Sequence, residues 1–313
     1  MIKSIISFKP SKHLSGILLM IANAFFMSLL YIIVKILTNN LGFTSNQVGF
    51  LYKITILILT LCSCLKLGFI HHLKTKKLFF HALRGFFSIM GSLSMFYAVS
   101  VMNVINAAAI SELTPVFMVI AGILVFNEKI TLPKIILLLG SIIGIIFIED
   151  FQSFGKNINK GHYFAFLALL FWSINNVIIK KLTKTEHSRA QLFYSSLFAS
   201  IFALPLAFFK FSFVFSNFNI NMSCAKWPEF TTQSLLLILS AGLASLLHKV
   251  SFFRAYKLSD MSIVGPFDYL RLPFTGIFAC LILKEAIPHV YSLIGYSFIV
   301  FSGMYFIVHK GKN

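Results

Sequence analysis

Three ionisable residues interrupt stretches of sequence that are otherwise apolar enough to cross a lipid bilayer. Glu112 lies in the apolar run 105–126, and Asp268 and Arg271 lie in the run 261–283, within the segment PFDYLRLPF. Charges in the hydrocarbon core are unfavourable, so they usually face a protein interior or a water-filled cavity and mark substrate or proton pathways. A carboxylate there can bind a cationic group or exchange a proton. We therefore expect these three residues to line a pathway through the membrane.

The spacing of Asp268 and Arg271 leaves two interpretations open. The two residues are three positions apart, the separation at which side chains of one helix meet. They could neutralise each other and so reduce the unfavourable desolvation of both charges. Alternatively, Arg271 could hold a carboxylate or phosphate of the substrate, for which its planar guanidinium is well suited. An amino-acid-like zwitterion would use both residues at once.

Other polar and aromatic residues in apolar runs extend this candidate pathway. Lys53 and Arg84 lie in the second and third runs, where either could snorkel to the interface and Lys53 could pair with Glu112. His248 could couple transport to protons or simply form structural hydrogen bonds. Amides such as Asn23 typically bond across helices, whereas Trp172 is expected on the substrate path. The predicted substrate or proton pathway comprises Glu112, Asp268, Arg271, Tyr269, Trp172, Asn176, Lys53, Arg84 and His248.

Three prolines fall inside the same apolar runs as these charges. Pro115, Pro266 and Pro273 each remove a backbone hydrogen bond and bend a helix, which frees a carbonyl one turn earlier. Bent helices are well placed to act as gates. We therefore predict bends at these positions and advance gating as a hypothesis.

The elements that must position these residues follow from composition. Hydrophobic residues make up 58% of the 313 residues and charged residues only 12%, although the formal net charge is +18. A soluble domain has about a quarter of charged residues, so this chain belongs with the polytopic membrane proteins. The basic residues lie in short gaps between apolar runs, a pattern typical of membrane topology rather than of nucleic-acid binding.

Ten apolar runs are long enough to cross the hydrocarbon core as helices. They cover approximately residues 14–37, 46–67, 79–100, 105–126, 132–149, 161–182, 190–209, 234–257, 261–283 and 289–309.

The distribution of basic residues predicts the orientation of these spans. With the N-terminus in the cytoplasm, 18 of the 27 Lys and Arg residues fall in cytoplasmic segments and six fall outside, among them Lys35. Cytoplasmic loops are enriched in these residues, so we expect both termini in the cytoplasm of a bacterial inner membrane. The longest loop, about 210–233, then lies outside and is too short for a catalytic domain. The sequence carries no catalytic set, metal-ligand cluster or cofactor motif, so we expect neither an enzyme nor a bound cofactor.

The chain also repeats itself. FFMSLLYIIVKILT (25–38) aligns with LFWSINNVIIKKLT (170–183) at an offset of 145, and residues 96–130 align with 253–287 at an offset of 157. The second alignment places Glu128 over Glu285. It also places Glu112 over Tyr269, one residue from Asp268. We therefore expect the two carboxylates, Glu112 and Asp268, at nearly equivalent positions of two repeats.

The repeat predicts two structural halves, residues 1–150 and 151–313, with five spans each. An odd number of spans forces the halves into opposite orientations. Inverted repeats are a recurrent transporter architecture, with the substrate site near the middle of the membrane between the halves. The two carboxylates would then approach one central cavity.

Three segments carry a resemblance to a known family. They are LFWSINNVIIKKL in the sixth span, SELTPVFMVIAGILVFNEKI across the fourth and PFDYLRLPFTGIFACLILKEAI across the ninth. With these segments the chain resembles EamA-type members of the drug/metabolite transporter superfamily over essentially its whole length. The resemblance implies ten helices, alternating access and a central cavity to which the fourth and ninth helices contribute. The chain departs from the pattern at Met27, opposite Trp172, and at Lys53, where the family often has Arg; both departures leave the cavity chemistry open.

We therefore predict an all-α integral membrane protein with about ten transmembrane helices in two inverted five-helix repeats. Its expected function is secondary transport, by alternating access, of an amino acid or a related zwitterionic or cationic metabolite. The resembling family includes exporters and also S-adenosylmethionine importers of intracellular bacteria, so uptake of S-adenosylmethionine or a nucleotide-like metabolite is the alternative; a membrane enzyme or channel is less favoured. Expected partners are the substrate, coupled protons or a counter-substrate, and the bilayer, for a monomer or homodimer that binds no nucleic acid.

Overall fold

The computed structural model describes residues 12–66, 75–126, 129–148, 160–182, 186, 188–214, 219–259 and 261–309. Within these ranges the first half consists of α1 (Lys12–Asn39), α2 (Ser45–Lys66), α3 (Leu78–Val101), α4 (Val104–Ser111), α5 (Thr114–Phe126) and α6 (Leu132–Ile148). The second half consists of α7 (Lys160–Leu182), α8 (Ser188–Phe208), β1 (Phe209–Val214), β2 (Asn219–Cys224), α9 (Thr232–Leu258), α10 (Met261–Val264), the 3₁₀ segment η2 (Gly265–Leu270), α11 (Arg271–Ile282) and α12 (Val290–His309).

Most of these helices are built to contact lipid. In the described part of the chain, seven helices are long and apolar enough to cross a membrane, and shorter apolar helices occupy the fourth and fifth predicted spans. Large apolar side chains such as Leu124, Leu281 and Phe301 are at least 70% exposed. Exposed apolar side chains of this size are stable on helices that lie in hydrocarbon, where the backbone groups are bonded within the helix. The predicted all-α, ten-span membrane fold is confirmed.

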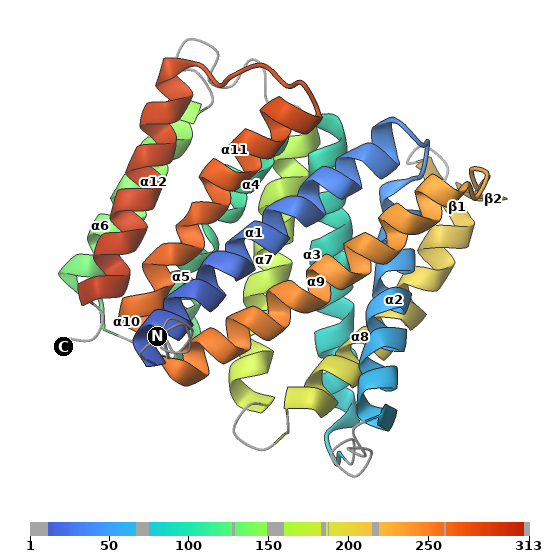
Figure 1. Cartoon of the computed structure of the whole chain (residues 1–313), viewed down its shortest axis with the longest axis horizontal. Helices are drawn as coiled ribbons and strands as arrows, with labels where there is room; N and C mark the ends of the chain where they lie inside the picture. Colours follow the sequence, from blue (N-terminus) through green and yellow to red (C-terminus); the bar gives the residue numbers. More distant parts are fainter. Residues whose placement is uncertain are drawn as a thin grey trace, which may run out of the picture.

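The helices of one half pack against those of the other (Figure 1). Figure 1 shows α1 and α9 running side by side. Behind them lie α3 and α7, which pack against each other. α2 packs against α8, and α6 against α12 at one edge of the molecule. The first span of each half thus lies along the third span of the other half. Exchanging the two halves leaves this set of contacts unchanged.

Small residues permit the close approach of these helices. A Cβ on Gly295 of α12 would lie 2.8 Å from Ile148 Cγ1 of α6, and a Cβ on Gly265 would lie 2.9 Å from Ile307 Cγ2. Small residues at helix crossings allow backbones to approach closely in membranes, where tight packing rather than apolar burial holds helices together.

One element was not predicted from the sequence. Within the segment expected to be a loop, β1 and β2 form an antiparallel hairpin in which Phe209 lies opposite Cys224. The alternation of Phe with Lys, Ser and Val in FKFSFV has the two-residue period of a strand.

Candidate functional site

The fourth span is interrupted where its carboxylate lies. α4 ends at Ser111 and α5 begins at Thr114, so Glu112 sits in the short break between them. Pro115 has no N–H to bond the carbonyl of Ser111, and the Thr114 hydroxyl donates to that carbonyl instead, at 2.7 Å. The carbonyl freed at the break is therefore bonded locally; the helix is interrupted next to Pro115, and the bend itself stays a prediction.

The ninth span is interrupted at the corresponding place. Its helix gives way to the 3₁₀ segment η2, with Pro266 at its start and Asp268 within it, and resumes as α11 at Arg271. Pro273 lies in the first turn of α11 and is exposed. This span thus departs from regular α-helix beside Pro266, whereas bending and gating at the prolines stay predictions.

An ion pair joins the two breaks. Arg271 Nε lies 2.7 Å from Glu112 Oε1, and the two side chains are only 11% and 4% exposed. Asp268 does not take this place; its Oδ1 accepts a hydrogen bond from Asn23 Nδ2 of α1, at 2.6 Å. Of the two interpretations left open for Asp268 and Arg271, mutual pairing is not what the structure has, because the guanidinium reaches across to Glu112 of the other half. Asn23 has the cross-helix role expected of it.

The predicted pathway residues converge on one cavity of about 520 Å³. Its lining includes all nine of them, namely Glu112, Asp268, Arg271, Tyr269, Trp172, Asn176, Lys53, Arg84 and His248, together with Pro115. Pro266 and Pro273 are not part of the lining. Residues scattered over six spans of the sequence are thus brought to one place between the two halves.

Two lining cations for which snorkelling to the interface was the alternative are buried. Lys53 is 1% exposed and donates to Ser88 Oγ at 3.0 Å, with its ammonium 5.0 Å from the ring centroid of Tyr52. Arg84 is 5% exposed, and its Nη1 donates to the backbone and side-chain oxygens of Gln191 at 3.0 and 3.1 Å. The alternatives of snorkelling for both residues, and of a Lys53–Glu112 pair, are therefore wrong.

Two glycines make room for aromatic lining residues. A Cβ on Gly91 of α3 would overlap the indole of Trp172, and one on Gly303 of α12 would overlap the hydroxyl end of Tyr269. Each ring therefore occupies the space that a side chain would otherwise fill. The positions of Trp172 and Tyr269 in the cavity therefore depend on the absence of a side chain at Gly91 and Gly303.

His248 and its neighbour Lys249 both line the cavity from α9. His248 lies against the backbone of Asn23, and its buried Nδ1 has no hydrogen-bond partner. Lys249 was not among the predicted pathway residues, because successive residues of a helix usually face different directions. No cluster of three or more His, Cys, Asp or Glu side chains suited to a metal ion occurs among the described residues.

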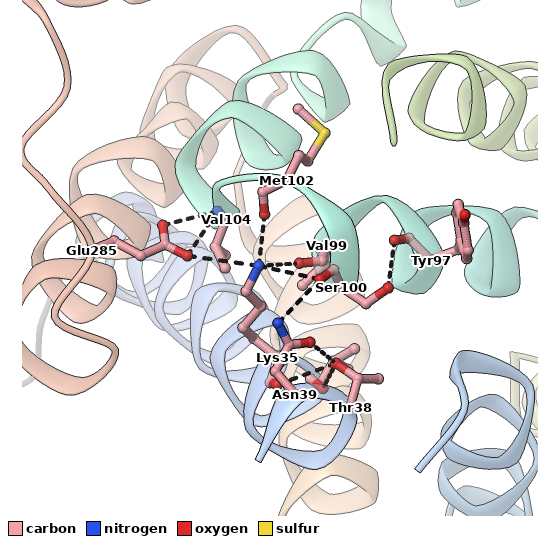
Figure 2. Close-up of polar contacts among 10 residues, drawn as sticks. Lys35, Thr38, Asn39, Tyr97, Val99, Ser100, Met102, Val104 and Glu285 are labelled. Atoms are coloured by element: carbon pink, nitrogen blue, oxygen red, sulfur yellow. Dashed lines mark hydrogen bonds and ion pairs between the residues drawn. The ribbon is translucent and has the colours of Figure 1, made fainter. Parts of the chain in front are cut away.

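A second polar cluster lies at the opposite end of the bundle (Figure 2). Lys35, near the end of α1, donates to the carbonyls of Val99 and Met102 at 2.9 and 2.8 Å, at the C-terminus of α3. Glu285 accepts from the N–H of Val104 at 3.0 Å, at the N-terminus of α4. Lys35 Nζ and the Glu285 carboxylate are 3.9 Å apart. Each charge thus sits at the helix end whose dipole favours it.

The backbone after α11 aims Glu285 at this cluster. Lys284 adopts a left-handed conformation with φ of 56°, and the N–H of Glu285 bonds back to the carbonyl of Ala279 at 3.1 Å. A residue in the left-handed conformation just after the last helical turn is a common way for a helix to end, because it turns the chain back and lets the last carbonyls find donors. We name Lys35 and Glu285, with the backbone groups of Val99, Met102 and Val104, the end cluster. The repeat partner of Glu285, Glu128, lies outside the described residues.

The cavity lies on the other side of the molecule from the end cluster. The residues that α7 and α9 contribute to its lining come from the second halves of these helices, and those of α3 extend back to Arg84, near the start of that helix. The end of α9 lies beside the start of α1, where His13 bonds Ser259 at 2.9 Å. The cavity is therefore displaced toward the side on which α1 begins, while Lys35 holds the side on which α1 ends.

Comparison with known proteins agrees with this architecture. The model of the EamA-like transporter family matches residues 14–149 and again residues 159–308. A crystal structure superposes on 93% of this chain and 96% of its own with a TM-score of 0.62; at 15% identity, this likeness shows the fold alone.

Individual relatives are more distant in sequence. An S-adenosylmethionine uptake transporter of Rickettsia bellii is 25% identical over 77% of this chain and 76% of its own. A riboflavin transporter of Vibrio cholerae is 23% identical over 88% of each chain. A pseudopaline exporter of Pseudomonas aeruginosa is 24% identical over 66% of this chain and 68% of its own. Relatives of similar identity thus carry different substrates in their names.

The two family matches together span nearly all of the described structure, and the broken fourth and ninth spans meet at its central cavity. This chain of membrane-spanning helices belongs to the EamA-like transporter family.

Proposed function

We propose that the protein is a secondary active transporter that moves a small polar metabolite, an amino acid or a related zwitterionic or cationic compound, by alternating access. The observation that carries the proposal is the 2.7 Å ion pair between Arg271 and Glu112, which joins the helix breaks of the two halves inside one cavity. When one half moves against the other, Arg271 or Glu112 can release its partner and bind a charged group of the substrate instead. Asp268, held by an amide rather than by a cation, remains able to bind a cationic group.

The arrangement corresponds to one of the two states that alternating access requires. With the predicted orientation, in which the N-terminus is cytoplasmic, the end cluster closes the outer side and the cavity faces the cytoplasm. Transport would then require Lys35 to release the carbonyls at the end of α3 and Glu285 to release the N-terminus of α4. In transporters of inverted repeats, such switching occurs by rocking of one bundle against the other around a central site.

Uptake of S-adenosylmethionine is the second candidate substrate assignment. Transporters of this name in Rickettsia are 25% identical over 77% of the chain. S-adenosylmethionine combines a sulfonium cation, an amino-acid zwitterion and an aromatic base. The cavity offers a carboxylate at Asp268, a guanidinium at Arg271 and an indole at Trp172. Its volume of about 520 Å³ is in the range of about 300–1,000 Å³ usual for small-molecule sites.

The cellular location and the orientation of the protein are proposed from its family and from the distribution of its basic residues. We place the protein in a bacterial inner membrane with both termini in the cytoplasm, as a monomer or homodimer. The family and its named relatives are transporters, which argues against an enzyme.

The test is counterflow in proteoliposomes. Purified protein would be reconstituted into vesicles preloaded with one unlabelled metabolite of a panel that includes amino acids, polyamines and S-adenosylmethionine, with and without a pH gradient. Transient accumulation of the labelled compound above its external concentration, saturable and dependent on the preload, supports a carrier. Uptake that neither saturates nor shows counterflow indicates a channel, and lipid turnover in detergent without any transport indicates an enzyme.

A further inference from the structure

The cavity carries more positive than negative groups. Besides Arg271, three cations line it: Lys53 from α2, Arg84 from α3 and Lys249 from α9. None of these three forms an ion pair with any described residue. The two acidic lining residues are engaged elsewhere, Glu112 by Arg271 and Asp268 by Asn23. We name Lys53, Arg84 and Lys249 the cation cluster.

The cation cluster has unused hydrogen-bonding capacity. Lys53 has three N–H donors, and one bond to Ser88 Oγ is seen. The Nε of Arg84 is buried and has no partner, although Nη1 is bonded to Gln191. Lys249 makes no hydrogen bond to any described residue. A buried donor without a partner is unfavourable, and Arg84 Nε is one, beside two ammonium groups with unused donors; together they indicate a missing acceptor.

The three charges also act on one another. Lys53 is subject to repulsion from Lys249 and Arg84, and Lys249 to repulsion from Arg84. Like charges in a site shielded from water repel strongly, and a buried charge is stable only when an opposite charge compensates it. The protein supplies no such charge here among its described residues. A bound anion would satisfy both the charges and the donors.

We propose that the cation cluster binds an anionic group, a carboxylate or a phosphate, of the transported molecule. Three donors from three helices suit the several oxygens of such a group, and the guanidinium of Arg84 matches its planar geometry. The cationic part of the same molecule then faces Asp268. This inference rests on the proposed function and narrows it: a purely cationic substrate such as a polyamine is excluded, and a metabolite with a free carboxylate or phosphate is required.

The first test measures binding without transport. Of the two tryptophans, Trp172 lines the cavity and Trp227 stacks on Phe230 outside its lining, so a Trp227→Phe protein reports on the cavity through Trp172 alone. Malonate and its uncharged dimethyl ester would be titrated at constant ionic strength, in detergent free of anionic lipid. A saturable fluorescence change with malonate and none with the ester is expected. Equal responses to both, or no response to malonate at millimolar concentrations, would overturn the proposal.

A matched pair of variants assigns the binding to the cluster. Lys249→Met keeps the length of the side chain and removes its charge; Lys257→Met makes the same change on the same helix, at an exposed position outside the cavity. Lys249→Met should weaken malonate binding by about tenfold or more. Lys249→Met also relieves the repulsion of Lys249 with Lys53 and Arg84. The melting temperature of this variant without anion should therefore be no lower than that of the parent protein. Unchanged malonate affinity in Lys249→Met, or equal loss in Lys257→Met, contradicts the assignment.

Two further comparisons are needed. The first distinguishes a lipid headgroup from a soluble anion, and the second distinguishes failure of the transport proposal from failure of the anion proposal. If phosphatidylglycerol abolishes the malonate response and no soluble anion restores it, the cluster binds a lipid headgroup rather than the substrate, and the proposal fails. Malonate binding without counterflow of any metabolite refutes the transport proposal alone. Counterflow that is insensitive both to malonate and to Lys249→Met refutes the anion proposal alone.

Discussion

Arg271 Nε and Glu112 Oε1 lie 2.7 Å apart, although 159 positions separate the two residues in the chain. The two residues belong to different halves: Glu112 directly follows the last residue of α4, and Arg271 is the first residue of α11 after the 3₁₀ segment. The pair therefore couples the two breaks, and any movement of one half against the other changes this contact.

Removing one partner of this pair should be more damaging to stability than removing both. Glu112→Gln leaves the buried guanidinium of Arg271 without its carboxylate, a loss that typically amounts to about 3–5 kcal/mol for a buried pair. The double variant Glu112→Gln/Arg271→Met should recover most of the lost thermal stability but not transport. Melting temperatures and counterflow of the four proteins in a double-mutant cycle measure this. Additive losses of stability would show that the pair is not coupled.

The hydrogen bond from Asn23 to Asp268 predicts that substitutions of these two residues affect the pH dependence of transport differently. Asp268→Asn preserves the shape of the side chain but removes the charge that a cationic group or a proton would need. We expect transport to fall and its dependence on pH to flatten. Asn23→Ala, which removes only the donor, should keep the pH dependence while reducing the rate. Initial rates across a pH series check both variants. If Asp268→Asn and Glu112→Gln both leave transport and its pH dependence unchanged, the site assignment is wrong.

The sequence predicted the spans, the breaks and the gathering of charges because each depends on local or repeated patterns. A run of about twenty apolar residues specifies a spanning helix. Prolines specify where hydrogen bonds are lost, and the repeat indicated that Glu112 and Asp268 approach one cavity. These predictions needed no knowledge of how a helix is rotated about its own axis.

The partners of individual charges could not be predicted for that same reason. Helices whose polar and apolar residues are spread around all sides, such as α9, give little indication of which face meets the bundle. The sequence therefore did not indicate Lys249 as a pathway residue beside His248, and it left a pair with Glu112 open for Lys53, which bonds Ser88 instead. The end cluster was overlooked as well, because Lys35 and Glu285 meet only after four helix ends are assembled.

Because Gly91 has no side chain and lies against the indole of Trp172, a substitution at Gly91 tests whether the position of this indole matters for transport. A methyl group at this position would occupy the space of the indole, so Gly91→Ala must displace either the ring or α3. We expect at least about a tenfold loss of transport, since misplacement of a lining group by about 1 Å can reduce activity a hundredfold. Val101→Ala, on the exposed side of the same helix, serves as the control. Gly91→Ala that transports at the parent rate would show that Trp172 has no part in the path.

The prolines provide a test of gating that does not involve any charge. Pro273→Ala restores an N–H near the start of α11 at an exposed position outside the cavity. If the bend is used for gating, the regained helical bond should slow the exchange between states and lower the maximal rate with little change in half-saturation. Pro133→Ala, in the first turn of α6, is the matched control. Normal transport by Pro273→Ala argues against gating at this break.

The end cluster predicts which way the conformational equilibrium moves. Lys35 makes two short charged hydrogen bonds to carbonyls of α3 and lies 3.9 Å from Glu285. Each such bond contributes about 1.5–3 kcal/mol, so its loss shifts an equilibrium by about tenfold or more. Lys35→Met should therefore favour the state in which this end is open. A cysteine replacing buried Met102, in a cysteine-free background, would report this as faster labelling by a membrane-impermeant maleimide.

A control variant and a second variant of the end cluster make this last measurement decisive. Asn39→Ala removes a neighbouring contact of α1 to the carbonyl of Ser100 that involves no charge, and it should leave labelling nearly unchanged. Glu285→Gln removes the charge at the N-terminus of α4 and should act in the same direction as Lys35→Met. Because the two side chains lie 3.9 Å apart and hold adjoining helix ends, their effects are coupled, and the double variant should show less than the sum of the two single effects. Labelling that is slower in Lys35→Met than in the parent would mean that the end cluster does not hold this side closed.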